Sequence, residues 1–328
     1  MNEDPPAPTE MVYPLTSTEP DVSRETESEP EEETPIAAAA AAAARIRGGR
    51  TETWPRPAAT RVLTVANQKG GVGKTTTTVN IAAALALHGL RVLVIDLDPQ
   101  GNASTALAVP HHAGEPSVYE VLVEGEPLAT ALHEVEAVPG LACVPATIDL
   151  AGAEIELVSL VARESRLQRA LSALLQDSAA SGQPFDFVFI DCPPSLGLLT
   201  INAFVAASEV LIPIQCEYYA LEGLGQLIRN VELIQSHLNP DLGVSTILLT
   251  MYDGRTRLAA QVADEVREHF RDIVLATAIP RSVRVSEAPS YSQTVLTYDP
   301  GSSGALSYLE AAREMAHRAM RPEGGASI

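Results

Sequence analysis

Short apolar runs and amphipathic segments alternate along the chain from residue 61 onward. The runs are rich in Val, Ile and Leu, which is typical of strands buried on both faces of a parallel sheet. They are RVLTVA (61–66), RVLVID (91–96), FDFVFID (185–191), EVLIPI (209–214) and VSTILLTM (244–251). Helical periodicity predicts helices over 75–88, 155–175, 221–237, 258–270 and about 302–320. The alternation predicts right-handed βαβ units and one α/β domain with a doubly wound, mostly parallel sheet.

The first 60 residues have a different pattern and predict a disordered acidic tail rich in Pro, Glu and Ala. Prolines punctuate a stretch of Ser, Thr and Glu with little to bury, and eight alanines follow at 37–44. So short an alanine run is marginal as an isolated helix in water. We interpret it as a linker, with a helix that forms on binding a partner as the alternative. The predicted organisation is a tail over 1–60, a folded domain over 61–321 and a flexible C-terminus over 322–328.

The charge is unevenly distributed along the chain. The 328 residues carry a formal net charge of −20, and residues 1–44 contribute half of it, with eleven acidic side chains against Arg24 alone. Because this charge lies on the predicted tail, the acidic composition does not exclude a nucleic-acid partner of the domain. Aromatic residues make up only 4% of the chain, which argues against a stacking surface for single strands.

Cysteine usage and hydropathy indicate a cytoplasmic protein. Cys143, Cys192 and Cys216 form no CxxC pair, so neither a disulfide framework nor a zinc module is indicated. No apolar run reaches the ~18 residues of a transmembrane helix, and the acidic start MNEDPPAPTE is unlike a secretory signal. We therefore expect no membrane span, and we interpret Cys192 as a small buried residue.

The segment after the first predicted strand has the chemistry of a phosphate-binding loop. Glycines let the backbone curl and direct N–H groups at phosphate oxygens, and the following helix adds the positive end of its dipole. Lys74 is expected to reach the β- and γ-phosphates, and the Thr75 hydroxyl to ligate Mg²⁺. The predicted nucleotide-binding residues are Lys69, Gly70, Gly71, Val72, Gly73, Lys74, Thr75 and Thr76.

Lysine usage points to the same loop. The chain has twenty arginines and only two lysines, Lys69 and Lys74. The broad planar guanidinium of arginine does not replace a compact ammonium among phosphates. Chance placement of both lysines within six residues is improbable, which favours the phosphate-binding interpretation.

Carboxylates follow two of the predicted strands. Asp96 ends the run 91–96 and Asp98 follows two residues later, whereas Asp191 ends the run 185–191. Doubly wound sheets bind ligands at the carboxyl ends of their strands, so we expect these side chains beside the phosphate loop. An Asp that ends an apolar strand is the Walker B pattern, which holds Mg²⁺ through water. Asp191 is therefore a predicted metal-site residue together with Thr75.

The sequence KGGVGKT, in which Lys69 precedes Lys74, resembles the deviant Walker A motif KGGxGK[ST]. In this motif, and over about 61–320, the chain is similar to ParA/Soj-type partitioning ATPases, P-loop NTPases in the wider group of MinD and the nitrogenase iron protein. The resemblance implies an ATP-dependent homodimer in which Lys69 reaches the partner's phosphates. It also implies that Asp98 orients the attacking water and that Asp96 supports Mg²⁺ or its waters. Lys69, Lys74 and Asp98 are thus the expected catalytic residues of a slow, switch-type ATPase.

Two C-terminal segments, at 251–270 and 277–315, resemble the DNA-segregating branch of this family. The resemblance implies that arginines there contact double-stranded DNA phosphates without reading sequence, and that Pro280 borders the adenine. An ion pair with a nearby acid is the ordinary alternative for a surface arginine. A ParB-like centromere-binding protein that stimulates hydrolysis, and association with the nucleoid, are also implied. The expected DNA-binding residues are Arg255, Arg281 and Arg284.

Two other functions stay open from the sequence alone. A MinD-like positioning ATPase would bind a membrane or a polar scaffold protein. The C-terminus MAHRAMRPEGGASI lacks bulky apolar side chains on a basic face, which disfavours a membrane, whereas a scaffold protein would fit the N-terminal tail. A metabolic ligase or synthase on this fold would show ATP turnover that depends on a small molecule.

Overall fold

The computed structural model describes residues 52–318. Most of the tail predicted over 1–60, with its alanine run, lies outside these residues. So do the last two residues of the helix predicted over 302–320 and the C-terminus predicted over 322–328. The predictions for these segments stay predictions.

One eight-stranded sheet forms the centre of the domain, in the order β3-β4-β2-β5-β1-β6-β7-β8. Only the pairing of β3 with β4 is antiparallel, so the predicted doubly wound, mostly parallel sheet is confirmed. Because β5 lies between β1 and β2, the ends of these three strands are neighbours. The strands are β1 (Arg61–Val65), β2 (Val92–Asp96), β3 (His133–Glu134), β4 (Leu141–Val144), β5 (Phe187–Asp191), β6 (Glu209–Gln215), β7 (Gly243–Tyr252) and β8 (Val274–Pro280).

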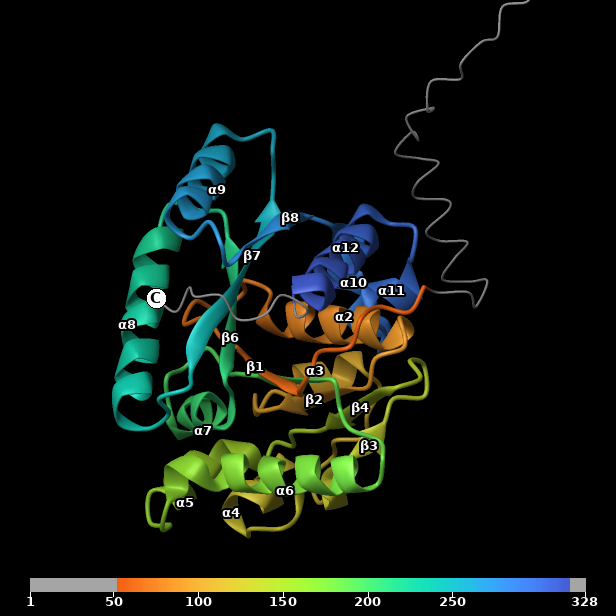
Figure 1. The fold of residues 1–328 in the computed structure, drawn as a ribbon, viewed down its shortest axis with the longest axis vertical. Helices are drawn as coiled ribbons and strands as arrows, with labels where there is room; N and C mark the ends of the chain where they lie inside the picture. The colour runs from red at the N-terminus through yellow and green to blue at the C-terminus, as the bar shows by residue number, and fades with distance from the viewer. Residues whose placement is uncertain (1–51, 319–328) are drawn as a thin grey trace, which may run out of the picture.

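Helices cover both faces of the sheet and close a separate apolar core on each side (Figure 1). One layer consists of α2 (Lys74–Leu87), α3 (Asn102–Ala106), α10 (Val283–Glu287), α11 (Val295–Tyr298) and α12 (Ser303–Arg318). The other consists of α4 (Val118–Val123), α5 (Leu150–Leu157), α6 (Arg166–Ala180), α7 (Leu198–Ala206), α8 (Ala220–His237) and α9 (Arg257–His269). Strands β2 and β5 are buried along their whole length, which explains their unbroken apolar runs.

The single helix predicted over 155–175 is wrong, because the structure has two helices there, α5 and α6. Between them Ala162 takes a left-handed backbone conformation with φ 52°. Asn202 on α7 stabilises the break: its Nδ2 donates to the carbonyl of Arg163 (2.8 Å), and its Oδ1 accepts from the backbone N–H of Leu167 (3.2 Å). A tertiary contact thus overrides the local helical pattern.

The sequence pattern also missed strand β8 at the edge of the sheet. Its run VLATAIP contains small and polar residues, and Ala276 is exposed, so it lacks the apolar signal of the central strands. The carboxylate of Glu314 on α12 accepts hydrogen bonds from the backbone N–H groups of Ala276 (3.0 Å) and Thr277 (3.3 Å). This cover protects an edge that would otherwise present free backbone donors.

The predicted boundary of the tail at residue 60 is too late, because residues before Arg61 pack on the domain. Trp54 is 6% exposed, and its indole stacks on the His88 ring with centroids 3.8 Å apart. Its backbone N–H also donates to the His88 carbonyl (3.1 Å), and Arg56 forms an ion pair with Asp186 (3.3 Å). One large buried aromatic ring anchors this segment, and the average composition of the proline-rich tail does not reveal it.

Candidate nucleotide-binding site

The glycine-rich loop joins the carboxyl end of β1 to the first turn of α2. Gly71 and Gly73 have φ values of 74° and 90°, a left-handed conformation that glycine adopts without steric cost. Gly73 is the N-cap of α2, and no side chain caps the helix. The amides of the first turn are therefore available to an anion, which the positive end of the helix dipole favours.

Two side chains hold this loop in place, one from the distant strand β7 and one from the loop's own start. The buried Thr250 on β7 donates its hydroxyl hydrogen to the carbonyl oxygen of Val72 (2.8 Å). Asn67 donates through Nδ2 to the carbonyl of Pro213 (2.9 Å) and accepts the backbone N–H of Lys69 (3.0 Å). Sequence reasoning missed Thr250, because a contact across 178 positions leaves no local signal.

Lys74 begins α2 and is 7% exposed. Burial lowers the pKa of its ammonium, while Asp191, Cys192 and Asp98 oppose that effect. Its Nζ lies 3.5 Å from the Lys69 carbonyl. A buried cation with so few partners is suited to phosphate oxygens. Its predicted role at the β- and γ-phosphates stays a prediction.

Lys69 lies on the exposed side of the same loop. Its ammonium is 2.5 Å from a carboxylate oxygen of Glu217, in the segment between β6 and α8, and both side chains are nearly half exposed. Gln215 also donates to Glu217. The structure thus separates the two lysines, one buried under the loop and one at its surface with an acidic partner.

Asp191 at the end of β5 has an unpartnered oxygen that fits a metal ion. The residue is completely buried; Thr78 donates to its Oδ1 (3.1 Å), whereas its Oδ2 has no partner among the described residues. Burial raises the pKa of Asp191, and the nearby Asp96 carboxylate raises it further, while the hydroxyls of Thr75 and Thr78 lower it. No cluster of three or more His, Cys, Asp or Glu side chains within 52–318 could hold a metal. Mg²⁺ suits such a site, because it takes few protein ligands and keeps waters and phosphate oxygens.

Asp96 supports the turn that carries Asp98. Its Oδ2 accepts both the backbone N–H (2.9 Å) and the hydroxyl (2.7 Å) of Ser104, and its Oδ1 accepts the N–H of Asp98 (3.1 Å). Asp98 is 8% exposed, and its Oδ1 accepts the N–H of Gln100 (3.1 Å). These bonds fix Asp98 beside the loop, close enough to Lys74 to influence its pKa. A role of Asp96 at Mg²⁺ stays a prediction, since both of its oxygens already accept hydrogen bonds.

All three predicted DNA-binding arginines are exposed: Arg255 follows β7, Arg281 follows β8, and Arg284 is in the short helix α10. Arg255 is paired with Asp253 through two bonds of 2.8 Å, and Arg284 with Glu287 (3.0 Å) and Asp299 (3.3 Å). No carboxylate of residues 52–318 forms an ion pair with Arg281. Ordinary ion pairing therefore describes two of the three arginines in this state.

Pro280, predicted to border the adenine, ends β8 and is partly buried. It lies opposite Tyr252 of β7. The backbone N–H of Arg281, the next residue, donates to the Tyr252 carbonyl (3.3 Å). The end of β8 is thereby fixed to the end of β7.

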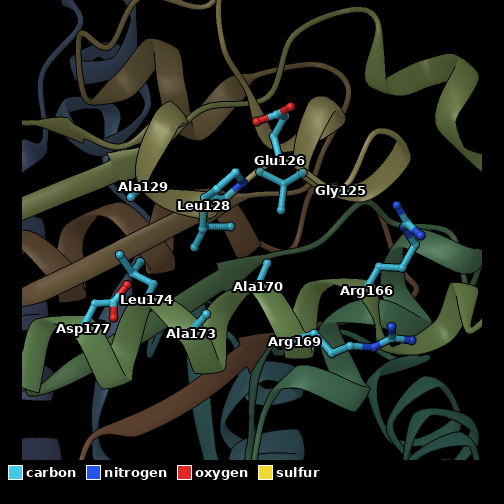
Figure 2. A pocket seen from close by; sticks show the side chains of 12 residues that line it. Gly125, Glu126, Leu128, Ala129, Arg166, Arg169, Ala170, Ala173, Leu174 and Asp177 are labelled. Atoms are coloured by element: carbon cyan, nitrogen blue, oxygen red, sulfur yellow. The ribbon is translucent and has the colours of Figure 1, made fainter.

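A separate pocket of about 360 Å³ lies between α6 and the segment after α4 (Figure 2). Ala170, Ala173 and Leu174 of α6 form one wall, and Leu128 lies opposite them. Arg166 donates to the carbonyls of Leu122 and Val123 (the latter at 3.1 Å), so its guanidinium supports the wall. None of the predicted site residues lines this pocket.

A glycine-rich loop with a lysine at a helix N-terminus, beside an aspartate that ends the adjacent parallel strand, defines a P-loop NTPase. The sequence model of the AAA domain family matches residues 60–244, more than half of the chain. The sporulation initiation inhibitor protein Soj of Bacillus subtilis (strain 168) is 52% identical over 256 residues, 78% of this chain and 98% of that protein. The chromosome partitioning protein ParA of Caulobacter vibrioides (strain NA1000 / CB15N) is 50% identical over 258 residues, 79% and 94%. The chain belongs to the ParA/Soj-type family of partitioning ATPases, a class that uses ATP and Mg²⁺.

Solved structures agree with this fold. A cobyrinic acid a,c-diamide synthase from Mycobacterium smegmatis, with bound ATP analog and magnesium, has a TM-score of 0.64 and 43% identity, covering 77% of this chain and 93% of that one. The septum site-determining protein MinD from Pyrococcus horikoshii OT3, complexed with Mg-ADP, has a TM-score of 0.61 at 24% identity, covering 77% and 94%, and supports the fold alone. No helix within residues 52–318 is long and apolar enough to cross a membrane.

Proposed function

We propose that the protein is an ATP-driven DNA-segregation switch of the cytoplasm that associates with the nucleoid. Binding of ATP and Mg²⁺ joins two copies into a dimer, the dimer binds double-stranded DNA without sequence preference, and hydrolysis releases it. A ParB-like centromere-binding protein is the expected activator. The relatives Soj and ParA support this class of function.

The observation that carries the proposal is the different location of the two lysines, one buried and one exposed. Lys74 is buried under the loop and serves the phosphates of its own protomer. Lys69 is exposed at the loop surface with only a solvated acidic partner, so it is free to serve a second protomer. A cation supplied across an interface makes the nucleotide part of that interface and couples assembly to hydrolysis.

The remaining residues have supporting roles in the proposed reaction. Thr75 and Asp191 would hold Mg²⁺, with Asp191 acting through water, and the ion would neutralise charge on the phosphates. Asp98, fixed by Asp96 and Gln100, orients the attacking water. No residue with the properties of a strong general base lies in this set, which suits a slow switch rather than a fast hydrolase.

Co-sedimentation of the full chain with plasmid DNA tests the proposal. Binding is expected with ATP and Mg²⁺, and weak binding with ADP. The variant Lys69→Gln, which keeps Lys74 and the P-loop amides, is expected to bind DNA equally weakly with either nucleotide. Equal binding of the unmodified protein in ATP and ADP would contradict the proposed switch.

The similarity to the diamide synthase supports a second candidate, a ligase or synthase on the same fold. That enzyme class would show ATP consumption that requires a small carboxylate acceptor and an amide donor. The candidate is less favoured, because Soj is more similar in sequence and is matched over 98% of its length. ATP turnover that rises with DNA and a ParB-like protein, but not with cobyrinic acid and glutamine, would exclude it.

A further inference from the structure

The end of β7 joins the phosphate loop to the arginine-bearing turn. Thr250 on this strand bonds the phosphate loop through Val72 (2.8 Å) and is 2% exposed. Two positions later, the carbonyl of Tyr252 accepts the backbone N–H of Arg281 (3.3 Å). A single residue, Met251, therefore separates a contact to the nucleotide site from a contact to a proposed DNA-binding residue.

Met251 has an unusual backbone conformation for this position. Its φ is 50°, in the left-handed region that residues other than glycine rarely adopt. The pairing of β7 with β8 shifts register between Leu249 and Tyr252, so the strand pairing is irregular at this residue. Bulges and strained residues concentrate at functional sites, and they persist where the structure on both sides holds them. Here the bonds of Thr250 and Tyr252 hold the two sides.

Two of the proposed DNA-binding arginines, Arg255 and Arg281, are held by the residues that follow Met251. Asp253 forms bonds of 2.8 Å with both the Nε and the Nη2 of Arg255, and it accepts the backbone N–H of Arg255 (3.1 Å). Hydrogen bonds from Arg255, with the charges of Arg255 and Arg281, lower the pKa of Asp253 to about 2. Residues 252 and 253 thus fix one arginine through the backbone and the other through a side chain. A change at Met251 would move both.

We propose that Thr250 and Met251 form a coupling element through which occupation of the phosphate loop sets the orientation of Arg255 and Arg281. This inference rests on the proposed DNA-binding function. Bound phosphates order the loop amides, including the peptide whose carbonyl accepts the Thr250 hydroxyl. Through the strained backbone of Met251, the position of Thr250 then determines which of two conformations residues 252–255 adopt. Nucleotide shifts the balance between these arrangements because it binds one of them better.

A pair of substitutions tests the contribution of the Thr250 hydroxyl. Thr250→Val keeps the branched shape but removes the donor to Val72, whereas Thr250→Ser keeps the donor and serves as the matched control. Hydrogen exchange of peptides covering 251–257 is measured with and without saturating ATP and Mg²⁺, with saturation checked by the amount of bound nucleotide. DNA affinity of the full chain is measured in parallel with ATP and with ADP.

In the unmodified protein and in Thr250→Ser, ATP is expected to change hydrogen exchange across 251–257. The ratio of DNA affinity with ATP to that with ADP is expected to be the same in these two proteins within about threefold. In Thr250→Val the exchange change is expected to disappear and the ratio to fall by at least about tenfold, which is 1.4 kcal/mol. An unchanged response in Thr250→Val would overturn the proposal.

The exchange measurement separates this inference from the proposed function. If the unmodified protein does not bind DNA, the proposed function fails, yet a nucleotide response of 251–257 that depends on the Thr250 hydroxyl would still support the coupling. If Thr250→Val does not fold, Met251→Gly provides the second variant. It removes the conformational strain and leaves every side-chain bond of Thr250 and Asp253 in place. It is expected to reduce the same response, and an unreduced response would overturn the coupling.

Discussion

Lys69 and Glu217 form an ion pair within one protomer, with the ammonium 2.5 Å from the carboxylate oxygen. The exposed fractions of the two side chains are 44% and 45%, so water screens the pair on both sides. Exposed pairs of this kind contribute about 0–1 kcal/mol. A pair this weak orients Lys69, but a more highly charged anion, such as a triphosphate on a second protomer, would replace Glu217 as its partner.

Glu217→Gln is expected to strengthen the ATP-dependent dimer. The substitution removes the competing carboxylate from both protomers, so the free energy of dimer formation should improve by up to ~1 kcal/mol per protomer. For the dimer this is up to ~2 kcal/mol, or about thirtyfold in the dissociation constant. Light scattering over a dilution series with saturating ATP and Mg²⁺ measures this constant. Glu222→Gln, on the first turn of the nearby helix α8, is the control and should have no effect. A weaker dimer in Glu217→Gln would mean that Glu217 itself bonds the partner.

Asp191→Asn is expected to abolish the contribution of Mg²⁺ to nucleotide binding. The variant keeps the shape of the side chain but removes the negative charge from the unpartnered oxygen. In thermal unfolding, Mg²⁺ should raise the stabilisation by ATP in the unmodified protein, and the variant should lose at least about 1.4 kcal/mol of it, a tenfold loss of affinity. Asp177→Asn on the exposed face of α6 is the matched control. Full Mg²⁺ dependence in Asp191→Asn would exclude this residue from the metal site.

Gly101→Ala is expected to lower both stability and ATP turnover. Gly101 has φ 61°, and an added Cβ would lie 2.9 Å from Cδ2 of His111 and 3.2 Å from the Ala146 carbonyl. Its backbone N–H donates to the carbonyl of Asp98 (2.8 Å), so a shift here moves the predicted catalytic residue. We expect a loss of ~1–3 kcal/mol in urea unfolding and a several-fold lower kcat.

Gly114→Ala is the control for Gly101→Ala, because it introduces backbone strain without a steric clash. Gly114 also has a positive φ, 85°, but nothing lies within 4 Å of an added Cβ. It should therefore lose ~1 kcal/mol of stability without a loss of kcat. Equal effects of the two substitutions on kcat would contradict a role of the Asp98 turn.

The packing of Trp54 on His88 predicts a specific dependence of stability on pH. Burial lowers the pKa of His88 from its ordinary value of 6.5, opposed by its hydrogen bond to Ala84 and by the charge of Glu52. The unfolded chain thus binds a proton more readily, so this contribution to stability is present above pH 6.5 and is lost as the pH falls through the lowered pKa. Trp54 is the only tryptophan, and its fluorescence follows urea unfolding.

When the pH is lowered from 7.5 to 5, the free energy of unfolding is expected to fall less in His88→Gln than in the unmodified protein. The exposed His112→Gln is the control and should behave like the unmodified protein. If both variants and the unmodified protein lose stability in parallel, His88 is not protonated on unfolding, and the packing described for it is incorrect.

The different partners of the arginines predict different losses of DNA affinity. Arg284 is held by Glu287 and Asp299, whereas Arg281 has no ion pair with residues 52–318. Arg281→Ala should therefore weaken binding to a duplex more than Arg284→Ala and reduce the dependence of log affinity on log salt by about 1 or 2. Salt titrations with ATP bound measure both. A larger effect of Arg284→Ala would mean that DNA displaces its acidic partners.

The loop and the carboxylate of the candidate phosphate site could be located from the sequence because their signals are local. The glycines, Lys74 and Thr75 lie within six consecutive positions, 70–75, and Asp191 ends an unbroken apolar strand. Such patterns reflect backbone geometry and burial that depend on a few neighbouring positions. The parallel sheet followed from the same strand and helix alternation.

The residues that position the site could not be predicted in this way. Glu217 meets Lys69 across 148 positions and Thr250 meets Val72 across 178, so only the fold brings them together. The break between α5 and α6 depends on Asn202, which lies outside the helical pattern it interrupts. In each case a tertiary hydrogen bond or ion pair decides the local structure.

Sedimentation velocity of the full chain tests the central claim most directly, namely that Lys69 serves the nucleotide of a second protomer. The unmodified protein should sediment as a monomer with ADP and as a dimer with ATP and Mg²⁺. Lys69→Gln should bind ATP and remain a monomer with either nucleotide. A monomer with ATP, or a dimer that persists in Lys69→Gln, would contradict the account.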